Sequence, residues 1–155
     1  MKKFIFSLIA VFTFLFVNAQ STGLVWKIKS NKIADSTYEI IATTIIEDGW
    51  HLYSNNPTIE GLEAPKFVFK LENIIPVSEI SFKNNSSTII DELFDKKSVN
   101  VYTGAVELKQ TIKLNGFIPT SIKLFVSAYI AKGLEFIPPS EKEIEVSLEG
   151  GTKIY

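Results

Sequence analysis

The stretch SIKLFVSAYIAKGLEFIPPS (Ser121–Ser140) decides how the rest of the chain is interpreted. Its first half alternates between apolar and more polar side chains, which is the period of a β-strand with one buried face. The residues expected on the buried face are Ile122, Leu124, Val126, Ala128 and Ile130. Those expected on the opposite face include Lys123, Ser127 and Tyr129. The pattern predicts an apolar strand at the centre of a β-sheet.

The second half of the stretch predicts a loop. The alternation stops at Ala131–Glu135, where Gly133 can adopt a backbone angle that other residues avoid. Pro138-Pro139 end any strand pairing, because proline has no N–H to donate. The strand is therefore expected to carry a short loop, rimmed by Tyr129 and Phe136, to one end of the sheet.

The remaining chain predicts further short strands separated by turns. The expected strands are Leu24–Ser30, Ser36–Glu47, Trp50–Ser54, Lys66–Leu71, Ile75–Phe82, Gly104–Asn115 and Glu143–Leu148. Outside the N-terminal apolar run no segment has a helical period, and there are no internal repeats or linkers. About eight strands of this kind indicate an all-β, antiparallel two-sheet sandwich in a single domain.

The N-terminus predicts a signal peptide over residues 1–19. Lys2 and Lys3 precede an apolar run, Phe4–Val17, and Val17-Asn18-Ala19 is a small-residue cleavage site. The run is shorter than the ~20 residues that span a bilayer, although a retained N-terminal anchor is the alternative. We expect cleavage after Ala19, a mature domain over residues 20–155 with no membrane span, and a periplasmic or secreted location.

The composition excludes several kinds of function. The chain has no cysteine, which excludes a lipoprotein anchor, disulfides, thiol exchange and thiolate metal sites. The formal net charge is −1, and every basic residue is lysine. Because arginine is the usual reader of phosphate and guanine, weak acidity without arginine argues against a nucleic-acid partner. No pattern indicates a cofactor.

Three motifs together resemble the N-terminal periplasmic domain of the thiol:disulfide interchange protein DsbD family. The first is Tyr129, its loop and Pro138-Pro139. The second is GWHLYS (Gly49–Ser54), which follows a long strand, as a similar run does in that family. The third is Asp91-Glu92-Leu93-Phe94, which is similar to an acidic pair followed by aromatics in the family's cap loop, although Leu93 replaces a frequent aromatic. The resemblance covers most of the mature chain and implies an immunoglobulin-like β-sandwich.

In the DsbD family the loop carries two cysteines, in the approximate arrangement Cys-x4-Cys-x-Pro-Pro. Counting back from Pro138 places the second on Phe136 and the first on Ala131, or on Ile130 if the loop follows the longer family form. The resemblance therefore implies a non-enzymatic variant, with an exported protein partner from a system such as a disulfide relay or cytochrome maturation. The partner-binding residues it implies are Asp91, Glu92, Leu93, Phe94, Tyr129, Ala131, Phe136 and Pro138.

The segment Ile89–Val101 allows two interpretations. Its charges surround Leu93 and Phe94 without a clear period. The resemblance implies a cap folded over the former cysteine site. The residues alone equally predict a surface hairpin with one buried aromatic, because an exposed Leu-Phe pair in a charged loop usually packs inward.

Two other functions are alternatives to this interaction role: ligand binding and hydrolysis. A small-molecule or peptide-binding sandwich would use a cleft lined by Tyr129, Phe94, Tyr53 and Trp50. A carboxylate hydrolase would need Asp91 and Glu135 held at a set separation, which nothing in the sequence fixes. His51 is the only histidine and cannot form a three-ligand metal site alone, so we expect a structural strand residue and no metal.

Overall fold

The computed structural model describes residues 23–56 and 58–152, and within these ranges the chain is built from thirteen short strands and one 3₁₀ turn. The first sheet contains β1 (Lys27–Ala34), β2 (Thr37–Ile45), β9 (Ala105–Leu114) and β5 (Ile74–Pro76), with β6 (Ser81–Phe82) also paired to β9. The second sheet contains β13 (Ile144–Ser147), β10 (Ser121–Ser127) and β4 (Lys66–Phe69). The third contains β12 (Glu135–Ile137), β11 (Ile130–Lys132), β3 (His51–Tyr53), β8 (Lys97–Tyr102) and β7 (Ser87–Asp91). The turn η1 (Glu92–Phe94) joins β7 to β8.

The main core lies between the first two sheets, whose strands all pair antiparallel. The first sheet contributes Tyr38, Ile40, Leu108 and Ile112, all inaccessible to solvent. The second contributes Ile122, Leu124, Val126 and Val146. Burying each of these aliphatic side chains contributes roughly 1.5–3 kcal/mol. The predicted fold class, an all-β antiparallel sandwich, is confirmed.

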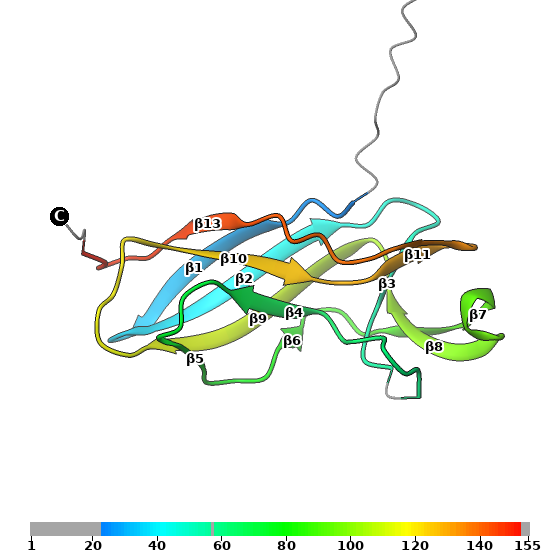
Figure 1. Cartoon of the computed structure of the whole chain (residues 1–155), viewed down its shortest axis with the longest axis horizontal. Helices are drawn as coiled ribbons and strands as arrows, with labels where there is room; N and C mark the ends of the chain where they lie inside the picture. Colours follow the sequence, from blue (N-terminus) through cyan, green and yellow to red (C-terminus); the bar gives the residue numbers. More distant parts are fainter. Residues whose placement is uncertain (1–22, 57, 153–155) are drawn as a thin grey trace, which may run out of the picture.

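The third sheet extends the sandwich at one end, where β3, β7, β8 and β11 gather away from β5 and β13 (Figure 1). Because strand residues alternate between faces, Leu52, Tyr102 and Ile130 reach the main core from one face of this sheet. The opposite face buries a second apolar cluster made of Tyr53, Ile59, Leu62, Val99, Val101 and Ala131. The end of the sheet, where the loop was expected, therefore has a small apolar core of its own.

The predicted start and end of the first strand are both wrong. The first strand was expected over Leu24–Ser30, but it begins at Lys27 and continues through Asn31–Ala34. It is an edge strand with a mostly exposed outer part, so polar side chains cost little there. The chain turns at Asp35-Ser36 instead, where Ser36 has a φ of 57°.

The opening strand and its loop also differ from expectation. The strand divides into β10 and β11, with a break at Ala128-Tyr129 that moves the chain from the second sheet to the third. The expected loop Ala131–Glu135 is mostly paired backbone, since β11 and β12 form a hairpin around Gly133-Leu134. A two-residue turn of type II′ needs a positive φ only at its first central residue, and here that residue is Gly133, with a φ of 58°.

The segment Ile75–Phe82 contains two short strands rather than one. Both β5 and β6 pair with β9, and Pro76 ends the first of them. The predicted signal peptide, residues 1–19, lies outside the described residues. No helix within residues 23–56 and 58–152 is long and apolar enough to cross a membrane.

Candidate functional site

The β11–β12 hairpin places the two candidate loop positions side by side. Ala131 and Phe136 are cross-strand partners, while the alternative position, Ile130, faces Ile137. On its other edge Ala131 faces His51 of β3. Ala131 is fully buried, because β11 lies between β12 and β3 and its side chain enters the second apolar cluster.

Phe136 lies at the rim of this cluster, with 40% of its surface exposed. Its ring stacks on Tyr129, with centroids 5.6 Å apart and planes inclined by 27°. It also approaches the buried ring of Tyr53 at 6.2 Å. The apolar rim predicted from Tyr129 and Phe136 is therefore present, and the two rings contact each other rather than flank an open gap.

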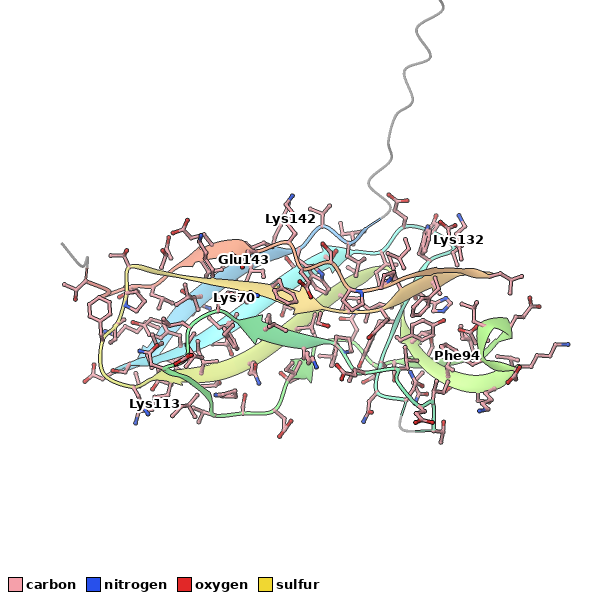
Figure 2. All side chains as sticks on the ribbon, viewed as in Figure 1. Lys70, Phe94, Lys113, Lys132, Lys142 and Glu143 are labelled. Carbon is pink, nitrogen blue, oxygen red and sulfur yellow. The ribbon has the colours of Figure 1, made fainter. Side chains whose placement is uncertain are left out.

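The turn η1 covers the cluster from the β7–β8 side. Asp91 caps the turn, since its Oδ1 accepts the Leu93 N–H at 2.8 Å. Left-handed backbone at Asp95 and Lys96 returns the chain to β8. The Phe94 ring packs edge-on against Tyr53, with centroids 5.6 Å apart, at the same end of the molecule as Lys132 of the hairpin (Figure 2). The segment is both a hairpin, as the residues alone predicted, and a cap, as the resemblance implied.

A buried polar group connects this cap to β3. Asp91 is only 4% exposed, and its Oδ2 accepts the Tyr53 hydroxyl at 2.6 Å. His51 Nε2 lies 3.4 Å from the same oxygen, and its ring meets Tyr53 edge-on at 4.9 Å. One oxygen of the Asp91 carboxylate thus accepts a short hydrogen bond from Tyr53 and also lies near the imidazole nitrogen of His51.

The surroundings shift the pKa values of Tyr53 and His51 so that both side chains favour their neutral forms. Burial raises the pKa of Tyr53, and the hydrogen bond to Asp91 and the negative charge of that carboxylate add to the effect. Burial lowers the pKa of His51, which the Asp91 charge and hydrogen bonding counter only in part. Both side chains are therefore neutral around pH 7.

The structure brings together most, but not all, of the predicted site residues. Those that meet around the cluster are Asp91, Leu93, Phe94, Tyr129, Ala131 and Phe136. Glu92 and Pro138 are exposed at its margin. Their joint role in binding a partner stays a prediction. Sequence reasoning missed that His51 and Tyr53 reach Asp91, although their i, i+2 spacing in a strand places both on one face.

The arrangement does not match the alternative chemistries. Asp91 is buried but Glu135 is exposed, so the two acids do not form a buried pair. In the described part of the chain no three His, Cys, Asp or Glu side chains cluster as metal ligands would. Trp50 packs against the main core rather than with Tyr53, Phe94 and Tyr129.

Comparisons with known proteins agree on the fold. No family model matches the sequence, and no curated relative matches it. Among solved structures, two matches are N-terminal domains of DsbD-like proteins, and the fold of this chain is that of a DsbD-like N-terminal domain without cysteine.

Two of these structures are close enough to compare in detail. The N-terminal periplasmic domain of ScsB from Proteus mirabilis matches with a TM-score of 0.57 and 13% identity, over 81% of this chain and 46% of that one. The reduced DsbD N-terminal domain from Neisseria meningitidis matches with a TM-score of 0.53 and 18% identity, over 82% and 86%. This chain thus spans less than half of the ScsB domain chain. At these identities the likeness establishes the fold.

Proposed function

We propose that this chain is an exported, non-catalytic interaction module that uses the hairpin and cap of a DsbD-like domain to dock another exported protein. The observation that carries the proposal is the cross-strand pairing of Ala131 and Phe136, the two positions that the DsbD resemblance assigns to cysteines when the shorter loop is counted. A chain without cysteine has no thiolate to exchange with a disulfide. What remains at this end is an apolar surface around Phe136, beside the η1 cap.

The proposed partner belongs to an exported system such as a disulfide relay or cytochrome maturation. Support comes from the predicted signal peptide and from the periplasmic location named for the ScsB domain. The partner would contact Phe136 and Tyr129, and the residues of η1 would form the other side of the surface. Aromatic side chains of this kind are enriched among residues that dominate binding energy.

The test compares capture of exported proteins by the mature chain and two matched variants. Phe136→Asp places a charge in the proposed surface, whereas Phe117→Asp does so at a similarly exposed phenylalanine (43%) in the β9–β10 loop. We expect Phe136→Asp to lose bound proteins that the parent and Phe117→Asp retain. Equal capture by all three would exclude the hairpin as the contact. Measurable reduction of a disulfide substrate by the mature chain would contradict the non-catalytic role.

A small-molecule or peptide-binding role is the alternative. The cleft predicted for it is occupied by the rings of Tyr53, Phe94 and Tyr129 themselves. A hollow of about 580 Å³ does border Trp50, on the face of the hairpin that carries Lys132 and Glu135. Since Ala131 and Phe136 point to the opposite face, ligand binding there would respond to Lys132→Ala and not to Phe136→Asp.

A further inference from the structure

We infer that the outer face of the first sheet binds an anionic lipid surface. The outer face is the one turned away from the second sheet, and it consists of the residues of β1, β2, β5, β6 and β9 that do not face the main core. The inference goes beyond the docking role proposed above, because it concerns a different surface and needs no protein partner.

Strand pairing determines which charged side chains lie on this face. Tyr38 and Ile40 of β2 and Leu108 of β9 face the main core, so the residues that alternate with them face outward. The pairing of β1 with β2, and of β6 and the residue after it with β9, extends this alternation to the neighbouring strands. The charged residues of the outer face are Lys27, Lys29, Lys83, Lys109, Lys113, Glu39 and Glu107.

The charge of this face is opposite in sign to that of the remaining chain. Five lysines and two acids give the face a formal charge of +3. The predicted mature chain, without Lys2 and Lys3, has a formal charge of −3, so its other residues together carry −6. The protein is therefore acidic as a whole but presents one basic face.

The two acids on the face both lie next to one lysine. Lys109 Nζ lies 3.8 Å from Glu39 Oε1 and 3.8 Å from Glu107 Oε1. Glu79, in the connection between β5 and β6, lies at the edge of the face. The lysines of the face that form no ion pair with another described residue are Lys27, Lys29, Lys83 and Lys113. These four ammonium groups are available to an anionic partner.

The available lysines are spread over the face rather than gathered at one point. Lys27 pairs with Thr43 and Lys113 pairs with Thr37, so their positions lie about 20 Å apart along β2. One small anion cannot contact both lysines. The spacing instead fits a broad anionic surface.

Aliphatic side chains project from the same face between the lysines. Ile45 is 79% exposed, Val77 58% and Ile75 45%. Ile45 borders a hollow of about 490 Å³ together with Lys27 and Lys83. Lysines interleaved with exposed aliphatic groups suit a bilayer surface, because the aliphatic groups enter the boundary of the hydrocarbon region while the ammonium groups contact lipid phosphates.

Two further considerations favour a lipid surface over an acidic protein. The predicted export delivers the mature chain to the outer surface of the membrane that it has crossed. With the first sheet lying on a bilayer, the hairpin and cap would stay accessible, because they lie at one end of the long axis of the molecule (Figure 1). Lipid binding and partner docking are therefore compatible.

The experiment measures flotation of the mature chain with lipid vesicles. Vesicles of phosphatidylcholine alone are compared with vesicles that contain about 30% phosphatidylglycerol, each at about 25 mM and 500 mM salt. We expect binding to the anionic vesicles at low salt and loss of that binding at high salt, because salt screens the attraction between lysines and phosphates. No binding at low salt, or equal binding to both kinds of vesicle, would overturn the proposal. The first of these results would leave an acidic protein as the occupant of the face.

A triple variant tests whether this face makes the contact. Lys27→Gln/Lys29→Gln/Lys113→Gln should lower the binding constant by about a hundredfold, which corresponds to roughly fivefold for each lysine. The control removes the same amount of charge from exposed lysines of β8, β10 and the segment before β13, as Lys97→Gln/Lys123→Gln/Lys142→Gln. An equal loss in the two triple variants would overturn the proposal. If the first variant does not fold, the lipid and salt dependence of the parent protein decide alone.

A second pair of variants tests the aliphatic contact. Ile45→Ser should weaken binding severalfold, whereas Ile90→Ser, at a position that is 63% exposed on β7, should not change it. Equal binding by these two variants would mean that no aliphatic group of the face enters the bilayer, and the lipid assignment would then be wrong. The vesicle assay contains no other protein, so the lipid proposal and the docking proposal can each fail alone.

Discussion

Ala131 and Phe136 face each other across the β11–β12 hairpin, one fully buried and the other half exposed. They are the two positions that the DsbD resemblance assigns to cysteines when the shorter loop is counted. The longer loop would assign Ile130, whose partner is Ile137 and whose side chain enters the main core. The register therefore favours the Ala131–Phe136 assignment, because only that pair shares one face of the hairpin.

A disulfide should form when both positions are changed to cysteine. Directly paired residues in an antiparallel hairpin have Cα atoms about 4.5–5.5 Å apart, within the range that disulfides require. We expect Ala131→Cys/Phe136→Cys to oxidise to an intramolecular disulfide, measured as the loss of both free thiols without dimer formation.

The matched control is Ala131→Cys/Glu135→Cys. Glu135 is the neighbour of Phe136 but pairs with Lys132, and its side chain points to the opposite face. This pair should keep two free thiols in the folded protein. Equal oxidation of both variants would mean that the hairpin register is wrong.

Removing the Asp91 carboxylate should destabilise the cap more than any neighbouring acidic change. Asp91→Ala removes a turn cap worth about 1 kcal/mol and leaves the buried Tyr53 hydroxyl without its acceptor, at a cost of about 1–3 kcal/mol. Asp91→Asn keeps one acceptor oxygen and should lose less. Chemical denaturation measures both changes.

The control for this prediction is Glu92→Gln, next in sequence but exposed. It should change the free energy of unfolding by less than about 0.5 kcal/mol. If Glu92→Gln and Asp91→Ala cost the same, the buried position of Asp91 does not matter.

The sequence predicted this site in part, for reasons that particular residues illustrate. Alternation along Ser121–Ser127 and Ala105–Leu114 identified strands whose apolar faces fill the main core. Counting back from Pro138 along the cysteine arrangement of the DsbD family pointed to Ala131 or Ile130 and to Phe136, but the sequence predicted a loop there and not a hairpin. The contact of His51 with Asp91 was not predicted, since forty residues separate them and only the pairing of β3, β8 and β7 brings them together.

Tyr53 should make stability fall at high pH. Its pKa is raised in the folded state by burial first and then by Asp91, so its contribution is complete below the unfolded pKa of about 10 and is lost as the pH rises above it. We expect the parent protein to lose more unfolding free energy between pH 8.5 and 10.5 than Tyr53→Phe does. Lysine titration affects both proteins alike, so the difference between them isolates Tyr53. Equal losses would mean that the hydroxyl is not buried against Asp91.

Strand boundaries were less predictable than strand faces. Asn31–Ala34 looks like a turn in sequence but continues β1, because the edge of a sheet accepts polar side chains. Ala131–Glu135 looks like a loop because alternation cannot reveal a hairpin with a two-residue turn. In both places pairing with a neighbouring strand, which a single sequence does not show, decided the structure.

Gly133 should be the most sensitive position of the hairpin turn. Its φ of 58° is unfavourable for residues with a Cβ, and there is open space around it, so the cost of substitution is conformational rather than steric. Gly133→Ala should lose about 1–2 kcal/mol of stability, measured by denaturation.

Exposed Leu134 has no positive φ, so Leu134→Ala should change stability by less than about 0.5 kcal/mol. Among the described strands β12 pairs only with β11, whereas β11 also pairs with β3, so hydrogen exchange in Gly133→Ala should rise first at 135–137 and later at Ala131. Uniform loss of protection across the third sheet would instead mean that the hairpin and the cap unfold as one unit.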